Sequence, residues 1–167
     1  MEPTNLRELL IDEMKDLYDA EHQIVQALEK MSKKASSNDL KMAFDQHRTQ
    51  TEGQIKRLEQ VFEQMDEKAT RKTCKGLKGL LSEGEEMMKE ISDPEVLDAA
   101  LISAAQRVEH YEMAGYGTCR TWANLLGEKQ AARLLQQTLD EEGETDKKLT
   151  MLAEKHINKD AQMQKAA

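Results

Sequence analysis

The sequence predicts an all-α fold, a bundle of four long helices arranged as two antiparallel hairpins, with a short extra helix in the connection between them. Two observations lead to this prediction. The chain of 167 residues contains 38% hydrophobic, 34% charged and only 4% aromatic residues, with ten Met and two Pro, a composition typical of helical proteins. Apolar residues also recur at alternating steps of three and four along four stretches. This length fits one domain with a substantial core.

The first hairpin is expected to begin near Asn5, which can cap a helix, with Glu8 completing a capping box. The stretch from Ala35 to Asn38 interrupts the apolar pattern and offers a cap for a second helix. Because this connection is short, the two helices should be antiparallel neighbours. Their inward stripes are Leu10, Met14, Leu17, Glu21, Ile24, Leu28 and Met31, and then Leu40, Phe44, His47, Thr51, Gln54, Leu58, Val61 and Met65.

A long crossover follows, from residue 66 to residue 92. It holds a polar stretch and a short helix, roughly 74–90, interrupted by three glycines. Asp93 and Pro94 are a helix start signal, an N-cap with proline at the first helical position. Gly127 is expected to end this third long helix as a C′ residue.

The stripes of the second hairpin are Leu101, Ile102, Ala105, Glu109, Glu112, Tyr116, Cys119 and Ala123, and then Ala132, Leu135, Leu139, Glu142, Asp146, Leu149 and Ala153. Two hairpins joined by a long crossover match the ferritin-like arrangement among four-helix bundles. Residues 1–160 are expected to form this single bundle, and residues 161–167 a disordered tail.

Six ionisable residues occupy stripe positions that otherwise hold core hydrophobes. They are Glu21, His47, Glu109, Glu112, Glu142 and Asp146. Glu21 precedes the first turn by about 15 residues, or roughly 22 Å of helix, and the others lie at similar heights, so the hairpins should bring them together near mid-bundle. Burying one ionised carboxylate costs several kcal/mol in a domain stable by about 5–15 kcal/mol. Cations or shared protons must therefore neutralise the cluster.

Carboxylate oxygens with a single imidazole suit iron or manganese better than structural zinc. The sequence thus predicts a metal centre, with Tyr18, Gln50 and Gln54 beside the ligands rather than on the metal. Taken singly, the residues have simpler interpretations: Glu21 as a partly exposed edge residue, Glu142 as part of an acidic run, and His47 as a hydrogen-bonded core histidine. Their convergence from four helices favours the metal centre.

Other function classes are disfavoured by the composition. The net charge of −8 argues against non-specific nucleic-acid binding, which needs a basic face. Cys74 and Cys119 are too few for a disulfide framework, which favours a reducing compartment. Because no apolar run approaches the length of a membrane span or a signal sequence, we expect a cytoplasmic protein.

At these same positions the chain resembles the YciE/YciF family of bacterial ferritin-like stress proteins, especially the YciF branch. The motifs that carry the resemblance are Asp98-Ala99-Ala100-Leu101-Ile102, Val108-Glu109-His110-Tyr111-Glu112, Tyr116-Gly117-Thr118, Glu141-Glu142, Thr145-Asp146 and, in the first hairpin, Ala20-Glu21, His47 and Gly53-Gln54-Ile55. The resemblance implies a dimer with a di-iron site of rubrerythrin type. It also implies that the metal ligands are Glu21, His47, Glu109, Glu112, Glu142 and Asp146. It also exposes a departure, because relatives usually have Glu where this chain has Gln50. The Glu-x-x-His pair of other ferritin-like di-iron proteins is absent from the sequence.

Two functions are consistent with these features. The first is a di-iron or dimanganese protein that handles iron, dioxygen or peroxide during stress, with ferroxidase-like or peroxidase-like turnover. The second is a non-catalytic, homodimeric helical protein in which the metal site is vestigial or purely structural; Gln50, which cannot bridge metals as a carboxylate does, motivates this alternative.

Overall fold

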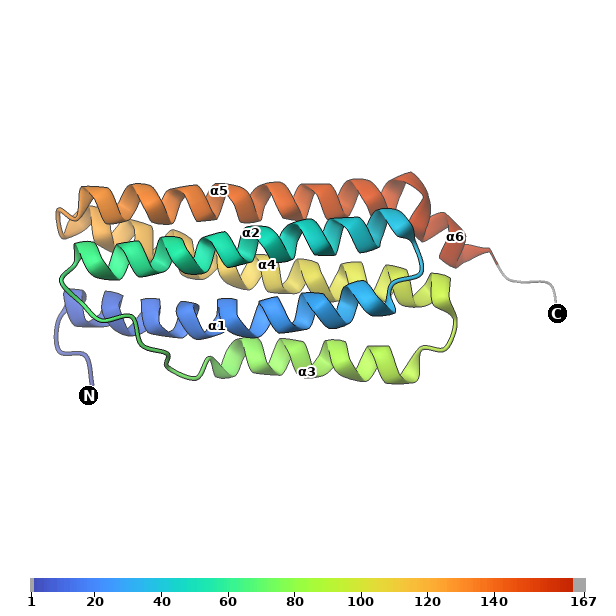
Figure 1. Ribbon diagram of the computed structural model, residues 1–167, viewed down its shortest axis with the longest axis horizontal. Helices are drawn as coiled ribbons and strands as arrows, with labels where there is room; N and C mark the ends of the chain where they lie inside the picture. Colours follow the sequence, from blue (N-terminus) through green and yellow to red (C-terminus); the bar gives the residue numbers. More distant parts are fainter. Residues whose placement is uncertain (1, 164–167) are drawn as a thin grey trace.

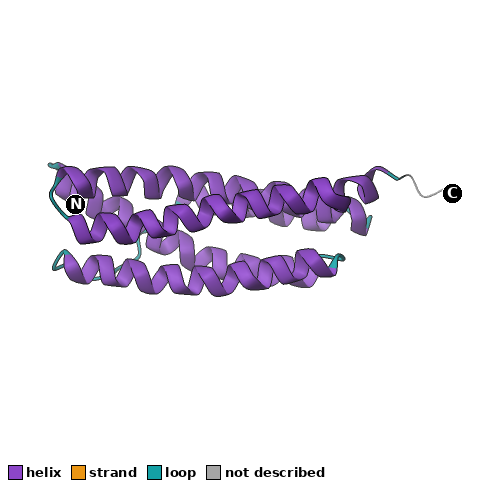
Figure 2. Ribbon diagram, turned by 90° about the horizontal axis from the view of Figure 1, so that it is seen from above, coloured by secondary structure: helices purple, strands orange, loops and turns teal. Residues whose placement is uncertain are grey.

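Six α-helices make up nearly all of the computed structural model, which describes residues 2–163. The long helices are α1 (Leu6–Lys34), α2 (Asn38–Gln64), α4 (Pro94–Leu125) and α5 (Lys129–Leu152); α3 (Lys75–Glu90) lies in the crossover, and a π-helical turn (Ala153–Ile157) leads into the short α6 (Asn158–Gln162). No strand occurs within residues 2–163 (Figure 2). The predicted all-α fold is confirmed.

The four long helices form a bundle in which each one packs against two others. Helix α1 packs against α2 and α4, and α5 also packs against α2 and α4. Figure 1 shows that α2 returns antiparallel to α1, and that α5 returns antiparallel to α4. The crossover carries the chain back along the bundle, with α3 packed outside α4 and α1 (Figure 1). This is the predicted ferritin-like arrangement of two hairpins.

The predicted helix boundaries agree with the structure, with one difference at the first cap. Asn5 Oδ1 accepts the backbone N–H of Glu8 at 2.9 Å, as expected, but the Glu8 carboxylate accepts the N–H of Thr4 rather than that of Asn5. Asp93 caps α4 by accepting two backbone N–H groups, with Pro94 at the first position. Gly127 has φ +82°, the left-handed conformation that ends a helix.

Two buried aspartates attach the connections to the bundle. Asp98 of α4 accepts the backbone N–H groups of Ser36 and Ser37 at 2.8 Å, and so holds the α1–α2 turn. Asp19 of α1 accepts the backbone N–H of Cys74 at 2.9 Å and the Arg71 guanidinium at 2.8 Å, and so holds the crossover. Although burial opposes it, these hydrogen bonds keep the pKa of Asp19 below its usual value.

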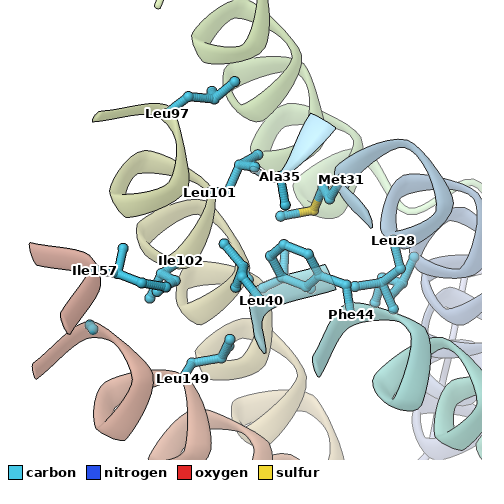
Figure 3. Close-up of a cluster of buried hydrophobic side chains, with 14 of the residues drawn as sticks. Leu28, Met31, Ala35, Leu40, Phe44, Leu97, Leu101, Ile102, Leu149 and Ile157 are labelled. Carbon is cyan, nitrogen blue, oxygen red and sulfur yellow. The ribbon is translucent and has the colours of Figure 1, made fainter. Parts of the chain in front are cut away.

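The interior of the bundle consists of two apolar clusters. One fills the end near the α1–α2 turn and includes Leu28, Leu40, Phe44, Leu101 and Leu149, which point toward one another in Figure 3. The other fills the opposite half and contains Leu10, Met14, Leu17, Leu58, Phe62, Tyr116 and Leu135, among others. A polar layer lies between these clusters.

Among residues 2–163, none of the helices combines the length and the low polarity that a membrane span requires. Of the tail that we expected to be disordered, residues 164–167 lie outside the described residues, while Ala161 and Gln162 belong to α6.

Candidate metal centre

Five ionisable side chains converge in the polar layer between the two apolar clusters. Each of the four long helices contributes at least one: Glu21 from α1, His47 from α2, Glu109 and Glu112 from α4, and Glu142 from α5. None of the five is more than 5% exposed. The apolar stripe sets the face of each helix, and these residues replace hydrophobes within it, so packing of the stripes forces them inward.

Their ligand atoms form two overlapping groups. His47, Glu109 and Glu142 make one group, and Glu21, Glu112 and Glu142 make the other; within each group the ligand atoms lie within 4.8 Å of one another. Glu142 belongs to both. His47 Nε2 lies 3.0 Å from Glu109 Oε1. The arrangement therefore offers two adjacent binding positions with one shared carboxylate.

Neighbouring polar side chains hold the carboxylates in place. Tyr116 donates its hydroxyl to Glu21 Oε1, and Gln54 donates its amide to Glu142 Oε1. Gln54 also reaches Glu141, which Arg57 binds through two nitrogens at 2.8 Å each. These contacts limit the rotamers of the buried acids, so the two groups of ligand atoms are formed in advance.

With the carboxyl groups ionised, each of the four glutamates nevertheless keeps a buried oxygen without a hydrogen-bond partner among residues 2–163. These atoms are Glu21 Oε2, Glu109 Oε2, Glu112 Oε1 and Glu142 Oε2. His47 differs, because its Nε2 lies 3.0 Å from Glu109 and Gln50 hydrogen-bonds its side chain. A buried polar atom left unpaired costs about 1–3 kcal/mol, and more if it is charged. Ligation of cations would satisfy these atoms together, so the residues present fit a metal centre with mainly oxygen ligands.

Burial also changes the protonation of the cluster. It raises the pKa of Glu21 to about 8, with the neighbouring Glu142 adding to the effect, and it raises the pKa of Glu109 to about 7. The pKa values of Glu112 and Glu142 lie well above the usual value for the same reason, whereas burial lowers the pKa of His47. Protons thus neutralise the metal-free cluster, and cations must displace them to bind.

Not every predicted site residue joins the cluster. Asp146 lies outside both groups, is 22% exposed, and accepts the Gln106 amide at 3.0 Å with His110 at 3.3 Å. Tyr18 donates its hydroxyl to Glu59 on the bundle surface, and not to a carboxylate of the buried cluster.

The remaining two predicted neighbours lie beside the cluster. Gln54 donates its amide to Glu142, and Gln50 lies next to His47, where its Oε1 accepts the Thr145 hydroxyl at 3.4 Å. The residue that the sequence interpretation missed is Tyr116, which we expected only to fill the core. Its position one helical turn after Glu112 on the same stripe was the available signal.

Comparisons with known proteins agree with this fold and with the resemblance noted in the sequence. The family model described as "Domain of unknown function (DUF892)" matches residues 5–162. Protein YciF of Escherichia coli K12 is 44% identical over 163 residues, which are 97% of this chain and 98% of that protein.

Two solved structures superpose over almost the whole chain. The crystal structure of the E. coli stress protein YciF gives a TM-score of 0.90 and covers 94% of this chain and 99% of that one, at 44% identity. YcfI of Rhodopseudomonas palustris, described as a candidate structural protein, gives a TM-score of 0.87 at 41% sequence identity. This match covers 88% of this chain and 94% of YcfI.

Proposed function

The chain belongs to the DUF892 family and is a YciF-like protein, and we propose that it binds two iron or manganese ions in the polar layer of its bundle. In this proposal His47 and Glu109 would hold one ion, Glu21 and Glu112 would hold the other, and Glu142, which belongs to both groups, would contribute to both. When bound, such ions supply Lewis acidity and redox capacity at positions open to an oxidant. We further propose that the centre reacts with dioxygen or peroxide during stress.

The observation that supports the proposal most strongly is the convergence of four buried glutamates on His47, because each ionised glutamate has one oxygen without a hydrogen-bond partner among the described residues. In the metal-free cluster a proton pairs Glu109 with Glu142, but it leaves Glu21 Oε2 and Glu112 Oε1 without a partner among the described residues, and such unpaired atoms destabilise a fold. Tyr116 satisfies only one oxygen of Glu21. That pattern is typical of metal ligands held by supporting hydrogen bonds.

The ligand chemistry favours iron or manganese. Four carboxylates provide hard oxygen donors and one imidazole provides nitrogen, and no cysteine is among the clustered ligands of the described chain. The chain's own residues would bind the ions, keep water out through the apolar clusters on either side, and release protons as the ions enter. From the family resemblance we also propose a homodimer that works in the cytoplasm.

A second candidate function is a non-catalytic helical stress protein in which the metals only stabilise the bundle. Gln50 favours it, because this neutral amide stands where relatives usually have Glu, next to His47, and is engaged by Thr145. The structural relative YcfI is itself described as a candidate structural protein.

The experiment loads the metal-free protein with Fe(II) under anaerobic conditions, measures iron per chain, and then adds dioxygen or hydrogen peroxide. We expect about two irons per chain and their rapid oxidation. Glu142→Gln should lose most of the iron, while Glu144→Gln, an exposed position on the same helix, should keep it. Binding of less than one iron per chain would contradict the proposal, and binding without faster oxidation than free Fe(II) would favour the structural candidate.

A further inference from the structure

An ion pair between α2 and α5 borders the polar layer. Arg57 binds both carboxylate oxygens of Glu141, through two guanidinium nitrogens at 2.8 Å each, and also donates to the Thr138 hydroxyl at 2.7 Å. Both side chains are mostly buried, with 14% of Arg57 and 21% of Glu141 exposed. Because a two-point guanidinium contact fixes the orientation of a carboxylate as well as its position, Glu141 is held in one place beside the layer.

Gln54 connects this ion pair to a proposed metal ligand. Its side chain is fully buried, and its Nε2 lies 3.2 Å from Glu141 Oε2 and donates to Glu142 Oε1. An amide nitrogen carries two hydrogens, so each carboxylate receives one of them. Hydrogen bonds therefore run without a break from Arg57, near the surface, to the buried Glu142.

Glu141 also decides which way the Gln54 amide faces. The carbonyl oxygen of Gln54, Oε1, is buried and has no hydrogen-bond partner among residues 2–163, which is unfavourable for the amide itself. If the amide turned over, however, this oxygen would face Glu141, a carboxylate that can only accept hydrogen bonds. As long as Arg57 holds Glu141 in place, the amide must present its N–H groups to both carboxylates.

The hydrogen bond from Gln54 to Glu142 bears on both proposed binding positions, since Glu142 belongs to both groups of ligand atoms. Gln54 occupies Oε1 of this carboxylate and so leaves Oε2 to the cluster. Hydrogen bonds of this kind orient metal ligands, and their loss typically weakens metal binding by about 10–100-fold. A change at the ion pair would reach both positions through this one amide.

We propose that Arg57 and Glu141 are positioning residues of the metal centre, which act through the amide of Gln54 to hold Glu142 in the orientation that serves both ions. The inference rests on the proposed function, in which Glu142 is a ligand. An ion pair with only a stabilising role would change the free energy of unfolding and leave the metal affinity of the folded protein unaltered.

The test measures the affinity of the full-length protein for Mn(II) in competition with a chelator. Glu141→Gln, which keeps the size of the side chain and removes its charge, and Arg57→Met should each weaken Mn(II) binding by about tenfold or more. Arg57→Lys should bind as weakly as Arg57→Met, because an ammonium keeps the charge but lacks the planar fork. The control Lys56→Met, which removes the same charge at an exposed neighbouring position, should leave the affinity unchanged.

A double-variant cycle tests whether the ion pair acts through Gln54. Gln54→Ala should weaken Mn(II) binding, and adding Arg57→Met to it should weaken binding no further, because the connection is already broken. If Arg57→Met weakens binding by the same factor with and without Gln54, or if Arg57→Lys binds like the wild type, the ion pair acts through its charge and the inference is overturned.

The Gln54 amide gives a second readout that needs no metal. In the metal-free protein both of its side-chain protons, assigned in NMR spectra by their loss in Gln54→Ala, should be protected from hydrogen exchange, and Glu141→Gln should remove the protection of one of them. If both protons exchange freely in the wild type, or if Glu141→Gln binds Mn(II) as tightly as the wild type, the inference is overturned while the proposed function survives. A wild-type protein that binds no metal would overturn both.

Discussion

Raising the pH should destabilise the metal-free protein, because its interior holds carboxyl groups that the folded state keeps protonated. Burial raises the pKa of Glu21 from 4.5 to about 8. Below pH 4.5 the folded and unfolded states both carry this proton, so the folded state keeps its full stability. Between pH 4.5 and pH 8 the unfolded chain releases the proton and the folded chain retains it, so stability falls as the pH rises through this window.

The magnitude follows from the size of the pKa difference. One pKa unit corresponds to about 1.4 kcal/mol, so Glu21 alone should lower the free energy of unfolding by about 3 kcal/mol between pH 5 and pH 8. Glu109, with a pKa of about 7, acts in the same direction. His47 acts in the opposite direction below pH 6.5, since burial lowers its pKa from that value, and Glu109 stops contributing above about pH 7, so the decline should be steepest between about pH 6.5 and pH 7. For a chain of this size, 3 kcal/mol corresponds to a Tm decrease of roughly 6–12 °C.

Circular dichroism melts of metal-free and metal-loaded protein at pH 5, 6, 7 and 8 would measure this effect. The metal-loaded protein should show a much smaller decrease, because bound cations replace the protons. Glu21→Gln should flatten the decrease in the metal-free protein, whereas the exposed control Glu144→Gln should not. A metal-free Tm that stays constant or rises from pH 5 to pH 8 would refute the reasoning.

Three further outcomes are expected from the packing and hydrogen bonds. Gly115→Ala should lower the free energy of unfolding by about 1–3 kcal/mol in urea denaturation, because the new Cβ would lie 2.8 Å from Leu17 Cδ2. The control Gly53→Ala, whose Cβ would meet open space, should raise the free energy of unfolding by about 0.5–1 kcal/mol. Equal effects of the two substitutions would count against the close approach of α1 and α4 at Gly115. Asp98→Ala should lower the free energy of unfolding, measured in the same urea denaturation, by about 1–3 kcal/mol, because the backbone N–H groups of the α1–α2 turn lose their acceptor. Asp98→Asn keeps one acceptor oxygen and should lower the free energy of unfolding by less. Tyr116→Phe should weaken metal binding about tenfold in competition with a chelator, because the carboxylate it supports loses its donor; unchanged affinity would show that this hydrogen bond does not position the ligand.

The fold and most of the proposed ligands could be predicted from the sequence because helix periodicity determines which face of each helix is buried. Glu21, Glu109 and Glu142 lie in phase with apolar residues one and two turns away, so their burial follows from the packing of the stripes. The crossover helix was also predictable, from the change in composition after Asp66, although the three glycines expected to interrupt it lie within a continuous α3.

Residues at the edge of a stripe were harder to place. Asp146 follows Glu142 by four residues on the same face, yet it lies near the surface, where Gln106 and His110 can reach it. A small rotation of the helix decides whether such a residue faces the core, and the sequence pattern does not resolve that rotation.

The two buried aspartates that hold the connections were not predicted either. Asp19 and Asp98 are satisfied by backbone N–H groups of segments distant in sequence, and the path of a connection is not encoded in the periodicity of the helix that receives it. The sequence predicts Tyr116 as a core residue for a related reason, since a tyrosine ring suits an apolar stripe and only the structure shows that its hydroxyl donates to Glu21.

We propose that four buried glutamates from three helices, together with His47 from a fourth, are ligands of metal ions. An anomalous-scattering map from a crystal grown without added metal, recorded on both sides of the iron and manganese absorption edges, tests it most directly. We expect two peaks near Glu142, one beside His47 and Glu109 and the other beside Glu21 and Glu112. If the polar layer shows no anomalous density in this crystal, nor in a second crystal grown from protein incubated with Fe(II) and Mn(II), the carboxylates are not metal ligands.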